Sequence, residues 1–187
     1  MADKFDILED SVRDLFARVV WSHKIQEKQA DIYQAQYRWM ETVNILCASL
    51  TSVGILSTIF VDYLWIKVVS AILSFATVFI AAYFKSFDLT KLAKAHKEAA
   101  NKLLALRNEI MSVLTSIKMK EKPLSELEDH YHELMSKANE LYKDVPSTTD
   151  KAVRLAREAL QVTGDNTFSK SEIDLYLPDA LKKGGNQ

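Results

Sequence analysis

Two long uncharged runs, separated by a short turn, constrain this chain more than any other feature of its sequence. The first covers residues 43–61 and the second residues 68–84, and only Asp62 and Lys67 carry charge between them. At 1.5 Å per helical residue each run spans roughly 26–29 Å, close to the ~30 Å hydrocarbon core of a bilayer. Both runs are apolar around the whole helix, whereas a surface helix of a soluble protein has one apolar stripe. The sequence therefore predicts a transmembrane helical hairpin, with spans at about 43–61 and 65–84.

Aromatic residues flank both predicted spans. Trp39 precedes the first span, Tyr63 and Trp65 lie in the turn, and Tyr83 is near the end of the second span. Tryptophan and tyrosine are enriched where spanning helices meet the lipid headgroups. These four residues are predicted to lie at the membrane interface. They argue against the alternative interpretation, a pair of buried core helices in a soluble bundle.

Basic residues are concentrated outside the turn of the hairpin. Three of them lie in residues 24–38 and four lysines lie in residues 85–97, whereas the turn contains only Lys67. The positive-inside rule therefore predicts that both termini lie in the cytoplasm. The chain starts with an acidic segment that lacks an apolar h-region, so we expect no cleavable signal peptide.

Helix-breaking residues are rare in the first two thirds of the chain. No proline occurs before Pro123, and Gly54 is the only glycine in the first 163 residues. No local signal therefore ends a helix within about residues 3–61 or 64–120, although the apolar period fades at residues 24–29. The pattern predicts one long antiparallel hairpin whose tip crosses the membrane and whose stem stands in the cytoplasm.

Apolar residues at alternating three- and four-residue steps form three seams outside the spans. Such seams are typical of helices that pack by knobs into holes, within one subunit or between subunits. They consist of Phe5, Leu8, Val12, Leu15 and Val19; of Leu89, Leu92, His96, Ala99, Leu103, Leu106, Ile110, Val113 and Ile117; and of Leu124, Leu127, Tyr131, Leu134, Ala138 and Leu141. The predicted fold class is an all-α membrane protein, a two-span transmembrane hairpin continued into a cytosolic helical, coiled-coil stem.

The predicted elements divide the chain into four parts. Residues 1–40 are expected to form an N-terminal cytosolic amphipathic helix, and residues 41–85 the transmembrane hairpin. Residues 86–164 are expected to form the C-terminal cytosolic helical stem. Residues 165–187 are expected to form a short helix and a flexible tail.

Capping signals mark two helices near the C-terminus. The first is expected over residues 149–162, with Gly164 as its C-cap. Ser169 and Glu172 resemble a capping box that opens a short last helix. Three roles are open for residues 168–177: docking on the stem, binding of a partner and regulation of opening. Their apolar side chains favour docking.

The sequence offers little catalytic or metal-binding chemistry. Its four glycines leave no phosphate-cradling loop, and it has neither a cysteine pair nor an HExxH motif. His130 and His132 are two residues apart, which on a helix points their rings about 200° apart and prevents easy sharing of one ion. We therefore expect no enzyme, no metal and no cofactor. The net charge of −1 gives no reason to expect nucleic-acid binding.

His96 occupies a core position of the second seam. One interpretation is a packed, hydrogen-bonded histidine, and the other is a residue that senses pH or a ligand.

Small and polar residues form one stripe on each predicted span. Their members are Asn44, Cys47, Thr51, Gly54 and Thr58 on the first span, and Ser70, Ser74, Thr77 and Ala81 on the second. Lipid offers no hydrogen-bond partners, so the stripes must face protein or water. In one interpretation they let the two helices pack closely. In the other, several hairpins associate and one stripe lines a water-filled pore, with Asn44 as the strongest individual candidate.

The order of these elements resembles a known family. An amphipathic helix that contains Trp21 and the segment WSHKIQEKQADIYQ precedes the tight two-span hairpin, and a helical tail follows it. Over about residues 12–160 the chain resembles the SLATT family of two-transmembrane effectors associated with nucleotide-signalling genes. The resemblance implies a role in bacterial anti-phage systems, with a nucleotide second messenger or a sensor protein as the trigger. That family has no catalytic residues to transfer.

These observations lead to two functional hypotheses. The first is an oligomeric pore-forming or membrane-disrupting effector of abortive infection in the bacterial inner membrane. Its expected partners are the lipid bilayer, further copies of the chain, and a nucleotide messenger or sensor protein. The alternative is a membrane-anchored adaptor whose cytosolic helices recruit a partner.

Overall fold

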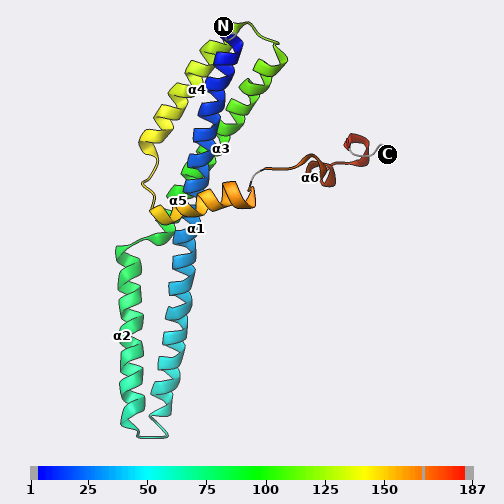
Figure 1. Cartoon of the computed structure of the whole chain (residues 1–187). Helices are drawn as coiled ribbons and strands as arrows, with labels where there is room; N and C mark the ends of the chain where they lie inside the picture. Colours follow the sequence, from blue (N-terminus) through cyan, green and yellow to red (C-terminus); the bar gives the residue numbers. More distant parts are fainter. Residues whose placement is uncertain (1–3, 166, 184–187) are drawn as a thin grey trace.

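The computed structural model describes residues 4–165 and 167–183 and shows an elongated helical molecule (Figure 1). A two-helix hairpin forms one end, and a bundle of helices forms the other end, which we call the stem. No β-strand occurs in the described part of the chain. The all-α prediction is confirmed.

Helix α1 runs without interruption from Lys4 to Ser57, a length of 54 residues. The interruption that the fading apolar period allows at residues 24–29 does not occur. Polar residues replace apolar ones there but keep the inward position, since Lys24, Gln26 and Gln29 are buried. The helix therefore belongs to the stem at its start and to the hairpin at its end.

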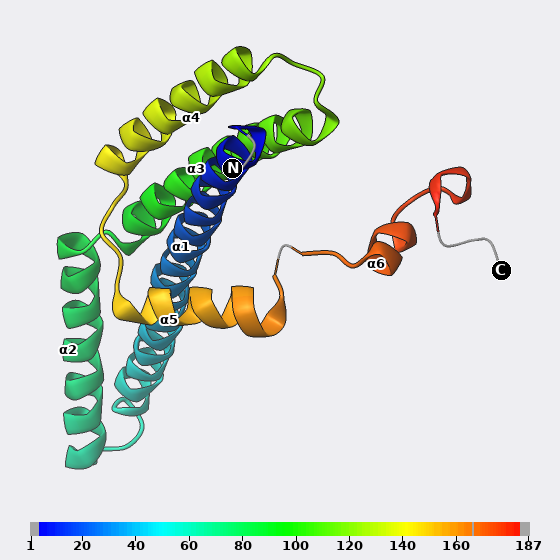
Figure 2. The ribbon, with the colours of Figure 1, turned by 45° about the horizontal axis from the view of Figure 1, so that its top comes forward.

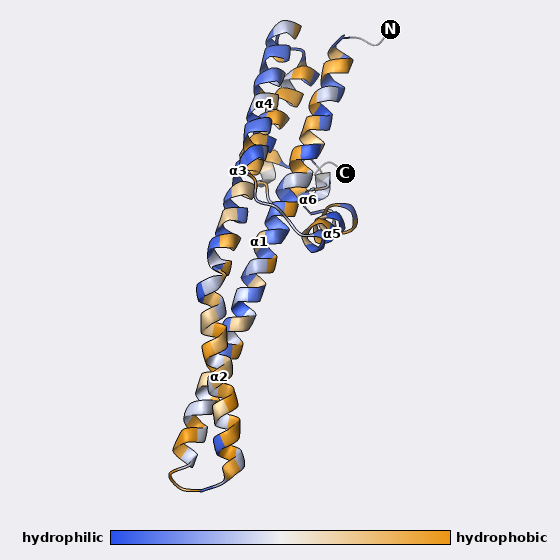
Figure 3. Ribbon diagram, turned by 90° about the vertical axis from the view of Figure 1, so that its left-hand side faces the viewer, coloured by the Kyte–Doolittle hydropathy of each residue, from blue (hydrophilic) through white to orange (hydrophobic). Residues whose placement is uncertain are grey.

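Helix α2 (Leu64–Ser86) runs antiparallel to the last part of α1 and completes the hairpin. Both helices contain stretches long and apolar enough to cross a membrane, and almost none of the residues in these stretches is buried. Apolar residues dominate the hairpin, whereas the stem carries many hydrophilic residues (Figure 3). A core helix of a soluble protein would bury such a stretch, because exposing it to water costs about 25 cal/mol per Å². The hairpin is therefore the membrane-spanning part of the molecule.

A break between α2 and α3 (Leu89–Met119) departs from the predicted continuous helix over residues 64–120. Phe87 adopts an extended conformation, and the carboxylate of Asp88 accepts a hydrogen bond from the backbone N–H of Lys91 at 2.9 Å. An aspartate that caps free amides stabilises a new helix start without help from proline or glycine. The prediction of an unbroken helix was wrong because it relied on those two residues alone.

The stem packs the first part of α1 against α3 and α4 (Leu124–Asp144). All three predicted seams contribute to one apolar core, in which Leu15, Leu103, Ile110 and Leu127 are completely or almost completely buried. Burial of one such side chain stabilises a fold by about 1.5–3 kcal/mol. Leu92 is the exception, since it is 40% exposed. The other core residues are Leu8, Val12, Val19, Leu106, Ile117, Leu134 and Ala138.

Helix α5 (Asp150–Glu158) crosses α1 at the lower end of the stem and continues as a short π-helix, Ala159–Thr163 (Figure 2). Thr149 caps its first turn, and Gly164 ends the π-helix with φ of 72°, a left-handed conformation that suits glycine. The predicted helix and its cap are confirmed. Three buried alanines, Ala152, Ala156 and Ala159, line the buried face of this segment.

Helix α6 (Lys170–Leu175) begins with the predicted capping box between Ser169 and Glu172, and a 3-10 turn follows at Asp179–Leu181. The predicted docking of residues 168–177 on the stem was wrong, because α6 stands away from the other helices (Figure 1). Phe168 and Tyr176 pack edge to face on each other and remain 63% and 78% exposed. Residues 184–187 of the predicted flexible tail lie outside the described residues.

Candidate functional site

The polar stripe of α1 faces α2. All its members are half-buried, whereas large apolar neighbours such as Leu50 and Val53 are exposed. These members are Asn44, Cys47, Thr51, Gly54 and Thr58. The helices approach closely at Gly54, where an added Cβ atom would overlap Oγ of Ser70. The stripe therefore allows close packing within one hairpin.

The polar stripe predicted on α2 is divided between two faces. Ser70 is buried and Thr77 is half-buried, whereas Ser74 and Ala81 are exposed. Leucine and isoleucine at positions 73 and 80 occupy the contact face instead. Because consecutive residues lie about 100° apart around a helix, this choice moves Ser74 to the edge of the interface. The three-four spacing fits two overlapping stripes, one through Ser74 and one through Leu73 and Ile80. It does not predict which of them faces α1.

Hydroxyl groups of both spans meet in a shallow groove of about 320 Å³ along one edge of the hairpin. The Thr51 hydroxyl donates to the carbonyl of Cys47 at 2.8 Å, and the Thr58 hydroxyl donates to the carbonyl of Ile55 at 2.6 Å. Such bonds satisfy each hydroxyl proton and leave the oxygen lone pairs facing outward. We call this feature the hydroxyl groove. It is lined by Thr51, Ile55, Thr58, Lys67, Ser70, Ala71 and Ser74.

The side chain of Asn44 carries an unpaired acceptor. Its Oδ1 atom is buried and accepts no hydrogen bond from the described residues. An unpaired buried polar atom costs about 1–3 kcal/mol, more than a typical hydrogen bond gains. Asn44 therefore places an unpaired polar atom inside the hairpin.

Gly54 offers a direct test of the hairpin packing. Gly54→Ala should lower the free energy of unfolding by up to about 2 kcal/mol, because crowding of Ser70 costs about 1–3 kcal/mol and the better helix propensity of alanine returns about 1 kcal/mol. Thermal unfolding in detergent measures the effect. Ser70→Ala in the same chain should restore most of the loss, whereas equal losses in the single and double variants would contradict the close approach.

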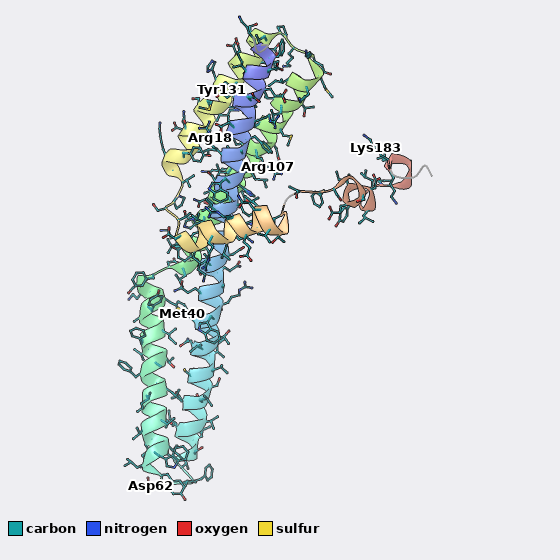
Figure 4. All side chains as sticks on the ribbon, in the orientation of Figure 1. Arg18, Met40, Asp62, Arg107, Tyr131 and Lys183 are labelled. Atoms are coloured by element: carbon teal, nitrogen blue, oxygen red, sulfur yellow. The ribbon has the colours of Figure 1, made fainter. Side chains whose placement is uncertain are left out.

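The predicted interface aromatics lie at the ends of the hairpin. Trp39, Tyr63 and Trp65 are all exposed, as a lipid-facing ring must be. Figure 4 labels Asp62 at the tip and Met40 near the opposite end. Tyr83 is half-buried, and its hydroxyl accepts a hydrogen bond from Nε2 of Gln36 at 3.2 Å. It therefore ties the two helices together.

His96 belongs to a buried group of polar side chains in the stem, which we call the polar cluster. Its members are His23, Lys24, Gln26, Gln29 and His96. The Nδ1 atom of His96 lies 2.6 Å from Oε1 of Gln26, whose Nε2 donates to the backbone carbonyl of Pro146 at 3.0 Å. In this arrangement the amide oxygen accepts and His96 donates, so the proton of the neutral ring sits on Nδ1. Nearby, Oε1 of Gln29 accepts bonds from both the backbone N–H and the hydroxyl of Thr149, at 2.9 and 2.8 Å. The cluster therefore fixes the linker that leads into α5.

Lys24 places a charge inside the same cluster. Its side chain is only 4% exposed, and its ammonium group lies 2.7 Å from Glu27 and 3.4 Å from Asp165. Asp165 follows the π-helix, so this pair joins α1 to the end of the α5 segment. A buried charge needs such partners to remain in the fold.

Sequence reasoning found His96 but missed His23, Lys24, Gln26 and Gln29. The first seam ends at Val19 in the prediction, yet further steps of four and three reach His23 and Gln26, both of which are buried. The signal was therefore present, although it consisted of polar residues at core positions.

Burial favours the neutral form of both histidines of the cluster. Burial lowers the pKa of His96 below the ordinary value of 6.5. Burial likewise lowers the pKa of His23, with contributions from Lys24 and two other cations and against the pull of Glu27. The unfolded chain therefore binds protons below about pH 6.5 that the folded chain does not bind.

The contribution of these histidines to the stability of the stem should consequently be fully present above about pH 6.5 and be lost in more acidic solution. We expect the melting temperature to hold from about pH 8 to 7 and to decline toward about pH 5.5. His96→Gln should reduce this decline, while His132→Gln, at an exposed position on α4, should leave it unchanged. Thermal melts over this range measure the effect, and an undiminished decline in His96→Gln would contradict it.

An exposed apolar hairpin joined to a packed helical stem defines a two-span membrane protein. The described residues contain no group of three or more potential metal ligands. The family model for the SMODS and SLOG-associating 2TM effector domain family 4 matches residues 8–172, and the chain belongs to this family. The predicted SLATT relationship is confirmed. No curated protein and no solved structure matches the chain.

Proposed function

We propose that this protein is an oligomeric pore-forming effector of a bacterial defence system, acting in the inner membrane without catalysis. Membership of a 2TM effector family makes it an effector of a defence-associated system. The observation that carries the pore is the hydroxyl groove, which collects hydroxyl groups of both spans along one edge of the hairpin. The distribution of basic residues favours a cytoplasmic location for both termini.

A pore of this kind requires several copies, because two helices do not enclose a channel. In a single hairpin the hydroxyl groove would face hydrocarbon, which gives its oxygen atoms no partners. Several hairpins side by side would turn the groove toward a shared lumen and supply water.

The stem would hold the closed arrangement until a signal arrives. A nucleotide messenger or a sensor protein that binds the open packing better shifts the population toward it, by no more than its differential affinity. The polar cluster is a suitable place for such control, because it joins α1, α3 and the α5 segment through a few hydrogen bonds.

Induction of the full chain in bacteria, with membrane potential and dye entry as readouts, tests the proposal. We expect depolarisation either from the chain alone or when the neighbouring signalling genes are expressed with it. An intact membrane under both conditions, with the protein present in the membrane fraction, would contradict a pore.

The second candidate is a membrane-anchored adaptor, which the protruding α6 favours. Leu175 and Tyr176 are 76% and 78% exposed there and are available to a partner. An adaptor should keep its activity when an unrelated two-span hairpin replaces residues 43–84, whereas a pore-forming effector should lose it.

A further inference from the structure

A second groove lies between α1 and the first turns of α3, outside the polar cluster and the hydroxyl groove. It measures about 540 Å³. Its polar lining comes from Gln34, Tyr37 and Arg38 of α1 and from Thr90, Lys94 and Lys97 of α3. The groove therefore combines three cations with several hydrogen-bond donors.

The positive charge of this groove is only partly neutralised. Asp31 is the one carboxylate in its lining. Lys94 makes a long, exposed pair with Glu98 at 3.9 Å, and such pairs are weak, so its ammonium group is available to a stronger partner. Lys97 lies 3.6 Å from Glu27, which is 27% exposed and also pairs with Lys24, so only part of the charge of Glu27 is used by Lys97.

Arg38 adds a planar donor set to these two lysines. Its guanidinium makes no ion pair with the described residues, in contrast to Lys94 and Lys97. A guanidinium presents paired N–H donors that match two oxygens of one phosphate. Arg38 and the two lysines thus favour a phosphate over a carboxylate.

The Arg38 end of the groove lies at the level of the lipid headgroups, and the groove extends from there toward the stem as far as Ala30 and Lys97. Arg38 comes five residues before the uncharged run of the first span, which corresponds to about 7 Å along a helix. The headgroup layer on each side of the hydrocarbon core is about 5–8 Å thick. Trp39, directly beside Arg38, is 69% exposed and marks the same level.

We propose that this groove binds the phosphate of an anionic lipid headgroup. Basic pockets between helices at the membrane surface are suited to such headgroups. A lipid bound there leaves its acyl chains beside the exposed apolar sides of the hairpin, which a soluble phosphate compound cannot use. The inference depends on the membrane position of the hairpin and not on pore formation.

The test compares two charge-matched variants of the full chain in detergent. Arg38→Gln with Lys94→Gln removes two cations of the groove. Lys85→Gln with Lys91→Gln removes two cations at a similar membrane level that do not line it. Retained phosphatidylglycerol and phosphatidylcholine are measured by native mass spectrometry, with circular dichroism as a check of folding.

We expect the intact chain to retain phosphatidylglycerol in preference to phosphatidylcholine. Each basic side chain near an anionic surface contributes roughly a fivefold factor in affinity, so the groove variant should bind phosphatidylglycerol about 25-fold more weakly. The control variant should change less than about threefold, since its lysines lie outside the groove. Inorganic pyrophosphate, added without lipid, tests whether the groove binds a soluble phosphate compound instead of a lipid headgroup.

Three results would overturn the proposal. Equal retention of the two lipids would remove the preference for an anionic headgroup. Equal losses in the two variants would indicate general surface attraction and no site. Pyrophosphate binding that the groove variant abolishes, with lipid retention unchanged, would assign the groove to a soluble phosphate compound.

Discussion

Thr51→Leu combined with Thr58→Leu should abolish dye entry into bacteria while the protein remains in the membrane. Both hydroxyls line the hydroxyl groove, and leucine replaces them with apolar surface that water does not wet. Insertion should be at least as favourable as before, because a central leucine contributes about −0.3 to −0.6 kcal/mol on an insertion scale. Membrane fractionation and dye entry, measured on the same cultures, separate these two effects.

The matched control is Ser49→Leu combined with Ser52→Leu. These hydroxyls belong to the same helix and also donate to carbonyl groups four residues earlier, at 2.8 and 2.9 Å, but their side chains are exposed outside the groove. The control should leak as much as the intact chain. Unchanged leakage in the threonine variant, or equal loss in both variants, would contradict a pore lined by the groove.

Removal of both carboxylates around Lys24 should strongly destabilise the stem. Glu27→Gln with Asp165→Asn leaves an ammonium group that is only 4% exposed without a counter-charge. The expected cost is about 3 kcal/mol, at the low end for a broken buried pair because both carboxylates are about one-third exposed. Urea unfolding, followed by circular dichroism near neutral pH, measures this loss.

Two further variants separate the buried charge from ordinary surface effects. Lys24→Met in the same chain should recover much of the loss, because it removes the unpaired charge. Glu109→Gln, which breaks the exposed pair with Lys137, should cost no more than about 1 kcal/mol. A double carboxylate variant as stable as the intact chain would show that Lys24 reaches solvent.

Acid should weaken the same contact. Burial alone would raise the pKa of Glu27, but the hydrogen bond and charge of Lys24, together with His23 and Lys97, lower it below the ordinary 4.5. A lowered carboxyl pKa contributes stability that is present above about pH 4.5 and is lost as the pH falls further. The stability contributed by Glu27 is therefore lost at lower pH than the stability contributed by the histidines.

The sequence predicts most of the fold because its strongest signals are long. The two uncharged runs and the three seams each extend over several helical turns, so one atypical residue does not hide them. The break before α3 depends on a single cap, Asp88, and on one extended residue, Phe87. A signal that short is hidden within an otherwise helical pattern.

The candidate sites are less predictable because they depend on which faces of the helices pack against each other. Ser74 and Thr77 fit the same three-four spacing, and only the packing of α2 on α1 turns one outward and the other inward. A prediction of the polar cluster would have required knowledge that the α5 segment returns across α1, where the Thr149 hydroxyl donates to Gln29. Contacts over 120 residues leave no local trace in the sequence.

Two connections join the stem to the membrane hairpin. One is the unbroken helix α1, and the other is interrupted at Phe87 and Asp88 between α2 and α3. A turn of the stem about its long axis would be carried along the unbroken α1 into the first span. The break at Phe87 and Asp88 would let α2 stay in place while the first span rotates beside it. Such a repacking of the stem would change which residues of the first span face the second, without movement of the hairpin along the membrane normal.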